Sequence, residues 1–285
     1  MAQPRQAAAI AKFRELHASG CFVLPNPWDI GTAIYLQHAG FKALATTSAG
    51  FAFTRGLPDR VSAIPLEVML GHIREIAGCT TLPVNADFQN GYADQPEEVG
   101  RNVLLCIETG VAGLSIEDAT GDVRQPLYEL KLAVERIRAA RRAIDRSGVP
   151  IVLTARCEAW LVGEANPFQV ARERLIAYSN AGADCLYAPG VKDLSQIADL
   201  VQAIAPKPLN VLVSASEPAM SVPMLSEAGV RRISVGSALA RVAWGAFMKA
   251  AQGIASGQSF ESFAGAASFA DLNAIFAGRV EDPDV

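Results

Sequence analysis

Leu82-Pro83-Val84-Asn85-Ala86-Asp87 is a short apolar run that ends at a carboxylate, and the pattern returns in Gly113-Leu114-Ser115-Ile116-Glu117-Asp118. Both runs have the length and composition of strands. Residues 95–110 between them have helical periodicity, so the whole stretch predicts a βαβ unit with parallel strands. Such a unit places Asp87 and Glu117 side by side at one end of the sheet. Two neighbouring carboxylates repel each other unless a cation or a proton lies between them, and Mg²⁺ with oxygen ligands meets that need.

Strand and helix signals alternate along the rest of the chain. The candidate strands are Phe22–Pro25, Ala43–Thr47, Leu82–Asp87, Gly113–Glu117, Ile151–Arg156, Cys185–Pro189, Leu209–Ser214 and Arg232–Gly236. Helical periodicity follows most of them, and several of these helices end at a glycine shortly before the next strand. Eight βα units predict a closed (β/α)8 barrel, an α/β fold. Because 51% of the 285 residues are hydrophobic, we expect residues 1–285 to form a single barrel domain.

Additional helices are expected around the barrel. Residues 4–19 have the pattern of an N-terminal helix, and residues 259–277 have that of a C-terminal helical tail. A tail this apolar must pack on its own barrel or on a partner subunit. The apolar region 233–254 contains Arg241 and Lys249, so it predicts a strand followed by a buried amphipathic helix rather than a membrane span.

The composition argues against several classes of protein. The formal net charge is −4, so no affinity for nucleic acid is expected. Four arginines cluster on one predicted helix and are expected to form a solvated face: Arg136, Arg138, Arg141 and Arg142. The five cysteines lack disulfide or metal-ligand spacing and are expected to be buried thiols in a reducing cytoplasm. The N-terminus has no long apolar segment, so neither a signal peptide nor a membrane partner is expected.

The expected C-terminal ends of the strands carry polar residues. In (β/α)8 enzymes the catalytic groups lie at these ends. The ring consists of Asn26, Asp29, Ser48, Gly50, Asp87, Glu117, Asp118, Arg156, Glu158 and Ser214. Few of these residue types belong in an apolar core, so the ring predicts a polar pocket able to hold one cation.

Six segments in order carry a family resemblance. They are Pro25-Asn26-Pro27-Trp28-Asp29, Thr47-Ser48-Ala49-Gly50 with Gly56-Leu57-Pro58-Asp59, Val84-Asn85-Ala86-Asp87 with Gly91-Tyr92, Ser115-Ile116-Glu117-Asp118, Ala155-Arg156, and Ser237-Ala238 with Arg241. On these segments the chain resembles the isocitrate lyase/phosphoenolpyruvate mutase superfamily over nearly its whole length.

The resemblance implies a metal site. Asp87 and Glu117 would hold Mg²⁺, with Mn²⁺ as the alternative, and Asp59 would lie in or near the outer shell of the metal. The metal would chelate an α-oxo acid through its carboxylate and keto oxygens and act as a Lewis acid.

The resemblance also implies a substrate site. The Ser48-Ala49-Gly50 turn would offer backbone N–H groups to a developing enolate oxygen, and one such donor contributes about 2.7–4 kcal/mol. Arg156 would clamp a substrate carboxylate, with Arg241 as a second cation and Trp28 in the substrate-binding segment. The candidate catalytic residues are Ser48, Gly50, Asp59 and Arg156.

The chain departs from the pattern of the superfamily at four places, one of which is a longer turn, Phe88-Gln89-Asn90, before Gly91-Tyr92. The lyases of the superfamily carry a loop with Cys and His after the strand that ends in the metal-binding Glu, whereas this chain has residues 119–124 there, with neither. That absence argues against isocitrate and methylisocitrate lyase activity. Asn85 stands where many members have a further Asp, and Pro189 stands where the lyases have a Glu.

The expected function is that of a Mg²⁺-dependent lyase that acts on a small α-oxo acid through a metal-stabilised enolate, as in oxaloacetate decarboxylation. The alternatives are P–C chemistry like that of phosphoenolpyruvate mutase or phosphonopyruvate hydrolase, and a catalytically weak sensor that binds an oxo acid. A third hypothesis is an oligomeric scaffold built around residues 259–277. The resemblance implies a homotetramer in which this tail is exchanged between subunits.

Overall fold

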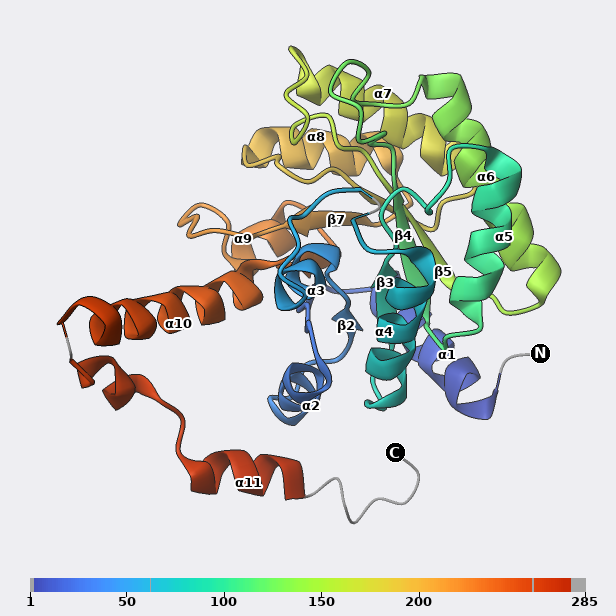
Figure 1. The fold of residues 1–285 in the computed structure, drawn as a ribbon. Coiled ribbons are helices and arrows are strands. Elements are labelled where there is room, and N and C mark those ends of the chain that lie inside the picture. Colours follow the sequence, from blue (N-terminus) through green and yellow to red (C-terminus); the bar gives the residue numbers. More distant parts are fainter. Residues whose placement is uncertain (1–2, 62, 258, 278–285) are drawn as a thin grey trace.

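The computed structural model describes residues 3–61, 63–257 and 259–277, and eight parallel strands form a nearly closed barrel (Figure 1). The strands are β1 Phe22–Leu24, β2 Leu44–Ala45, β3 Val84–Asp87, β4 Gly113–Glu117, β5 Val152–Arg156, β6 Cys185–Tyr187, β7 Leu209–Leu212 and β8 Arg232–Ser234. They pair in the order β1-β8-β7-β6-β5-β4-β3-β2, and a 3.0 Å hydrogen bond from the N–H of Ala45 to the carbonyl of Pro25 joins the two ends. The predicted (β/α)8 barrel and all eight strands are confirmed.

Helices follow or flank the strands. They are α1 Pro4–Ala18, α2 Ile30–His38, α3 Ser48–Thr54, α4 Leu66–Gly78, α5 Pro96–Ile107, α6 Leu130–Ser147, α7 Pro167–Asn180, α8 Leu194–Ile204, α9 Val222–Glu227 and α10 Ala238–Gly257, then the 3-10 helix η1 Glu261–Gly265 and α11 Phe269–Ala277. The expected N-terminal helix is α1, and the expected tail divides into η1 and α11. Several strands are one or two residues shorter at an end than predicted, and those end residues belong to the flanking loops.

Helix α1 packs against the N-terminal ends of the strands. Phe13 on this helix is fully buried, and its ring lies 6.2 Å from that of Phe22. A Cβ atom at Gly113, the first residue of β4, would lie 2.8 Å from Cε1 of Phe13 and 2.9 Å from the carbonyl oxygen of Val152. Only glycine therefore fits under this helix without a shift of the backbone. The polar residues of the expected site lie at the opposite ends of the strands.

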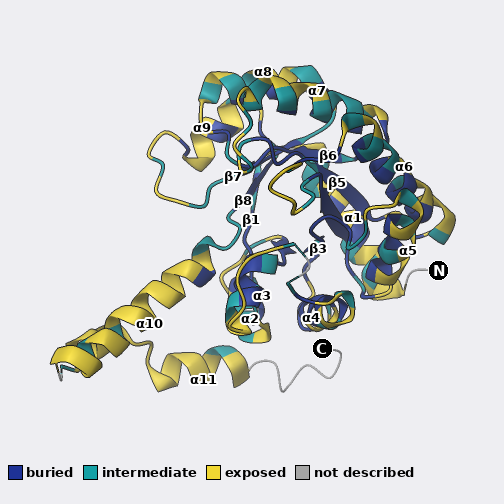
Figure 2. Cartoon of the chain, turned by 45° about the horizontal axis from the view of Figure 1, so that its top comes forward, coloured by how far each residue is buried: buried dark blue, intermediate teal, exposed yellow. Residues whose placement is uncertain are grey.

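Helix α10 does not pack on the barrel as expected. It runs outward from the end of β8, and nearly all of its surface is exposed (Figures 1 and 2). Ala240 is buried, whereas Val242 and Phe247 are 70% and 62% exposed. The expectation of a buried helix is therefore wrong for the single chain. Apolar periodicity shows that one face of a helix avoids water, but it does not show which surface covers that face.

The arginines of α6 do not form one solvated face, which corrects that expectation. Arg136 is 1% exposed and lies with its Cζ 3.8 Å from the ring centroid of Tyr128. Arg141 pairs with Asp184 at 3.0 Å, and Arg138 pairs with Glu135 on the surface. Periodicity placed all of them on one helix, but Arg136 and Arg141 have partners on other elements that periodicity does not show.

Four of the five free cysteines are buried, as predicted, and Cys21 is half-buried. Burial raises the pKa of the Cys157 thiol well above its ordinary value, so this thiol is held in its unreactive protonated form. Within the described ranges, none of the helices combines the length and the apolarity that a bilayer span requires.

Candidate active site

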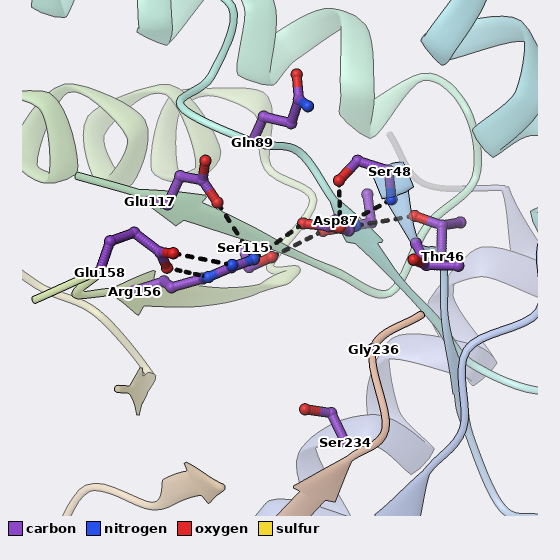
Figure 3. A network of polar contacts seen from close by, with 12 residues as sticks. Thr46, Ser48, Asp87, Gln89, Ser115, Glu117, Arg156, Glu158, Ser234 and Gly236 are labelled. Carbon is purple, nitrogen blue, oxygen red and sulfur yellow. Dashed lines mark hydrogen bonds and ion pairs between the residues drawn. The ribbon is translucent and has the colours of Figure 1, made fainter. Parts of the chain in front are cut away.

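Asp87 ends β3, and groups from the end of β2 hold its carboxylate. Its Oδ2 accepts hydrogen bonds from the backbone N–H and from the hydroxyl of Ser48, each at 2.9 Å. Its own N–H donates to Oγ1 of Thr46 at 2.9 Å (Figure 3). Because Ser48 begins α3, the first turn of this helix directs an N–H group at the carboxylate. Ser48 and Asp87, which lie 39 residues apart in the sequence, thus form one unit.

Arg156 lies between the two predicted metal-binding carboxylates. Its Nη1 is 3.5 Å from Oδ1 of Asp87 and 3.2 Å from Oε2 of Glu117 (Figure 3). The pairing of Glu117 with Arg156 across β4 and β5 places these two side chains at the same level of the barrel. The predicted convergence of Asp87 and Glu117 is therefore present, and the cation that touches both is a guanidinium.

Glu158 fixes the remaining edge of this guanidinium. Its two carboxylate oxygens accept from Nε and Nη2 of Arg156, the latter at 3.1 Å, and Glu158 is only 4% exposed. Oδ1 of Asp118 accepts from the backbone N–H of Glu158 at 2.9 Å. Oδ2 of Asp118 in turn accepts from Tyr178 and Arg174 of α7. Asp118, a member of the predicted polar ring, therefore orients Glu158 and does not contact the guanidinium of Arg156.

The site concentrates acidic side chains in a buried region. Burial raises the pKa of the Glu117 carboxyl above its ordinary value; the charge of Arg156 opposes this shift, and neighbouring carboxylates add to it. Asp59 lies on the loop after α3. Desolvation raises the pKa of its carboxyl, and the charge of Asp87 adds to the shift. The carboxylates of Asp87, Glu117 and Glu158 contact the Arg156 guanidinium, and Asp59 adds a fourth carboxyl nearby; this excess of acids over the one contacting arginine favours a further cation.

The donor set fits a hydrated divalent ion rather than an ion enclosed by protein ligands. In the part of the chain that the structure describes, no three His, Cys, Asp or Glu side chains form a metal-binding group. Mg²⁺ usually keeps several waters and binds through one or two carboxylates. Asp87 and Glu117 supply two carboxylates that approach one common point, the Nη1 atom of Arg156. Their role as metal ligands stays a prediction.

The Ser48-Ala49-Gly50 turn forms the start of α3. The N–H of Ser48 donates to Asp87, and the N–H of Gly50 donates to Oγ1 of Thr47 at 3.1 Å, as in an N-cap. Two of the N–H groups expected to meet an enolate oxygen therefore already have protein partners. A Cβ at Gly50 would lie 2.6 Å from Cγ2 of Thr47 and 3.1 Å from Cβ of Trp28, so glycine is required here by packing. The oxyanion role of the turn stays a prediction.

Two predicted substrate-binding residues, Arg241 and Trp28, lie outside the group formed by Asp87, Glu117, Arg156 and Glu158. Arg241 is exposed at the base of α10 and donates to the backbone carbonyl of Ser214 at 3.2 Å. It lines an apolar hollow of about 450 Å³ together with Trp244 and Met248. Trp28 lines a second hollow, of about 280 Å³, on the same helix. Neither residue lines the cavity at Asp87.

That cavity extends into the barrel and contains residues that the sequence did not single out. Its volume is about 40 Å³, and its polar lining consists of Asn26, Thr46, Asn85, Asp87, Ser115, Arg156, Tyr187, Asn210, Arg232 and Ser234. Arg232 is 2% exposed and donates to Asn210 at 2.8 Å and to Thr154 at 3.0 Å. The sequence signal that could have identified these cavity-lining residues is a polar residue inside an otherwise apolar strand, such as Asn210 in β7.

A (β/α)8 barrel with acids and a guanidinium at the C-terminal ends of its strands has the architecture of an enzyme for a small anionic substrate. The model of the phosphoenolpyruvate phosphomutase family matches residues 13–255. The chain therefore belongs to this family, within the isocitrate lyase/phosphoenolpyruvate mutase superfamily of lyases and mutases.

Individual relatives agree with this assignment. A crystal structure of a Burkholderia cenocepacia J2315 protein of inferred lyase or mutase function superposes with a TM-score of 0.92, at 44% identity, over 96% of this chain and 98% of that one. The 2-methylisocitrate lyase of Escherichia coli K12 is 33% identical over 178 residues, which are 60% of this chain and 59% of the lyase. The oxaloacetate decarboxylase of Rhodopseudomonas palustris BisA53 is 30% identical over 233 residues, which are 80% of this chain and 77% of the decarboxylase.

Proposed function

We propose that this protein is a Mg²⁺-dependent lyase that decarboxylates a small α-oxo acid, with oxaloacetate as the substrate. The observation that carries the proposal is the convergence of Asp87 and Glu117 on the guanidinium of Arg156. When bound at the two carboxylates, Mg²⁺ would supply a Lewis acid for the carboxylate and keto oxygens of the oxo acid. Similarity to an oxaloacetate decarboxylase over four fifths of the chain supports this choice of substrate.

The residues of the chain bind and orient the substrate. Arg156 would bind the carboxylate of the oxo acid through Nη2 and Nη1 once a bound cation draws Asp87 and Glu117 away from Nη1, while Glu158 holds the Nε edge. The reaction breaks the bond between the β-carbon and the leaving carboxylate, CO₂ departs, and the electron pair forms the enolate of pyruvate. A proton from water then converts the enolate to pyruvate. Ser48 would keep Asp87 in place through two hydrogen bonds.

The loop after β4 supports decarboxylation over thiol-dependent cleavage. Residues 119–127 form a hairpin closed by an antiparallel bridge between Ala119 and Leu127, and they include neither Cys nor His. At Gly121 a Cβ would meet Cβ of Val61 at 3.2 Å, so the hairpin packs closely on the loop that carries Asp59. Decarboxylation needs no acid or base from this hairpin, because CO₂ leaves without a proton.

Two other functions have specific support. The family model is that of a phosphomutase, which favours P–C chemistry on phosphoenolpyruvate or phosphonopyruvate. The neutral Asn85, which lines the cavity at Asp87, favours a sensor that binds an oxo acid without consuming it. A cytoplasmic location stays a prediction.

A substrate screen separates these functions. Purified protein is incubated with oxaloacetate, phosphoenolpyruvate, phosphonopyruvate or 2-methylisocitrate, in Mg²⁺ or in EDTA, and the released products are measured. We expect pyruvate and CO₂ from oxaloacetate in Mg²⁺, at a rate above that of Mg²⁺ alone. Turnover of a phosphorus-containing substrate instead would assign the phosphomutase-like chemistry. Tight oxo-acid binding without turnover of any compound would assign the sensor.

We also propose that α10, η1 and α11 form an arm that is exchanged between subunits of a homotetramer. Phe260, Phe263 and Phe269 on this arm are 62%, 52% and 89% exposed in the single chain. Phe276 approaches α2, where its Cζ would lie 3.7 Å from a Cβ at Gly31. An apolar surface of this kind is characteristic of a segment that another subunit covers.

Deletion of residues 259–285 tests the arm. We expect light scattering after size-exclusion chromatography to give fewer subunits per particle, because η1 and α11, which would pack on the partner subunit, are removed. Deletion of residues 278–285 alone is the control and is expected to leave the mass per particle, expressed in subunits, unchanged. An unchanged subunit number after the longer deletion would contradict the exchange. A lower number with full activity per subunit would favour a purely structural role for this segment.

A further inference from the structure

Arg136 in the middle of α6 is a buried arginine whose guanidinium binds backbone oxygens at the expected metal site. Its Nη2 donates to the carbonyl of Asn90 and, at 2.8 Å, to that of Ala93. Its Nη1 lies 3.5 Å from the carbonyl oxygen of Glu117. One side chain thus contacts both the turn that follows β3 and the last residue of β4.

The turn after β3 has a backbone that needs external support. Gln89 and Tyr92 have φ values of 43° and 56°, in the left-handed region that non-glycine residues rarely occupy, and Gly91 has a φ of 77°. Such conformations persist where the surrounding structure holds them. Arg136 binds carbonyls in the middle and at the end of this turn, at Asn90 and Ala93.

Backbone hydrogen bonds join the same turn to β4. The N–H of Phe88 donates to the carbonyl of Ser115 at 3.2 Å, and the N–H of Glu117 donates to the carbonyl of Gln89 at 2.9 Å. Asp87 directly precedes this turn. The turn therefore helps the β3–β4 ladder to place the carboxylates of Asp87 and Glu117 relative to each other.

Tyr128 holds the guanidinium of Arg136 in place. Its ring centroid lies 3.8 Å from Cζ of Arg136, which is a cation–π contact. The Tyr128 hydroxyl donates to Asp94 and accepts from Nδ2 of Asn90 at 3.1 Å. Asn90 is thus bound at two points, its side chain by Tyr128 and its carbonyl by Arg136.

We infer that Arg136 is a positioning residue that holds the turn 88–93 against the end of β4 and so keeps Asp87 and Glu117 aimed at one point. This inference rests on the proposed function insofar as that point binds a divalent ion. Its effect on the metal passes through the backbone, because its hydrogen bonds at this site go to the carbonyl oxygens of Asn90, Ala93 and Glu117.

The test measures Mn²⁺ binding by the loss of the free-ion signal in electron paramagnetic resonance. Removal of a residue that orients metal ligands typically weakens binding about 10–100-fold, and we expect Arg136→Met to raise the Kd for Mn²⁺ by at least about tenfold. Arg141→Met is the matched control, because Arg141 lies on the same helix but pairs with Asp145 and Asp184. It is expected to lose stability and to keep the wild-type Kd within about twofold. A wild-type Kd in Arg136→Met would overturn the inference.

Hydrogen exchange provides a readout that is independent of the metal. In Arg136→Met the Glu117 amide, bonded to Gln89, is expected to exchange at least about tenfold faster than in Arg141→Met. If wild type binds no Mn²⁺, the proposed metal site fails, and the exchange of Glu117 alone decides the role of Arg136. Equal exchange in both variants would overturn that role. If Arg136→Met does not fold, Arg136→Lys is compared in the same two measurements, and wild-type behaviour of Arg136→Lys in both counts against the inference.

Discussion

Replacement of Asp87 by alanine is expected to lower kcat/KM for Mg²⁺-dependent oxaloacetate decarboxylation by about 10³-fold or more, because one of the two converging carboxylates is lost. Asp87 is also the acceptor for both groups of Ser48 and a partner of Arg156. Its removal takes away the acceptor of the two Ser48 hydrogen bonds at the start of α3. Arg156 then pairs with Glu117 and Glu158 alone. Steady-state release of pyruvate in Mg²⁺ measures the effect.

Two variants separate the charge of Asp87 from its hydrogen bonds. Asp87→Asn keeps an oxygen that accepts from Ser48 but removes the charge, and we expect most of the loss to remain. Asp199→Asn, on the exposed surface of α8, is the control and is expected to retain wild-type kcat/KM. Activity of Asp87→Asn close to wild type would show that the charge of Asp87 is not needed, and the metal proposal would then fail.

Replacement of Arg156 by glutamine is expected to destabilise the fold by about 3 kcal/mol in EDTA, the lower end of the range for breaking a buried ion pair. Asp87, Glu117 and Glu158 all contact this guanidinium, and their side chains are 17%, 10% and 5% exposed. Without Arg156 these carboxylates repel one another in a region shielded from solvent. Urea unfolding in EDTA measures the loss.

Mg²⁺ is expected to restore part of the stability that Arg156→Gln loses. The gain in the free energy of unfolding on adding Mg²⁺ is expected to be larger for Arg156→Gln than for wild type. A ligand at 100 times its Kd contributes about 2.7 kcal/mol, and in the variant the ion faces no competing guanidinium. Arg241→Gln is the control, since Arg241 is exposed and bonds a single carbonyl, and its stability is expected to stay within about 0.5 kcal/mol of wild type. An Arg156→Gln variant as stable as wild type in EDTA would refute the proposed role of this arginine as the internal counter-ion.

The barrel, and the position of the site at the C-terminal ends of the strands, could be predicted because both depend on local sequence signals. A run such as 113–117 is apolar enough to be a strand, and parallel strands place their C-terminal ends on one side of the sheet. Asp87 and Glu117 were therefore expected to be neighbours, and they share the Nη1 atom of Arg156. Arg241 illustrates the limit of this reasoning. It follows a strand end in the sequence, but its helix, α10, runs away from the barrel, so Arg241 does not line the cavity at Asp87.

The sequence by itself determined where the eight strands lie, to within one or two residues at their ends, and which strand ends carry charge. Only the tertiary structure decided that Arg156 lies between the two acids, that Arg136 is buried against the turn 88–93, and that α10 extends away from the barrel. The physical reason is range. Strand and helix periodicity arises from neighbours within a few residues, whereas the partner of a long charged side chain depends on elements that approach it only when the chain has folded.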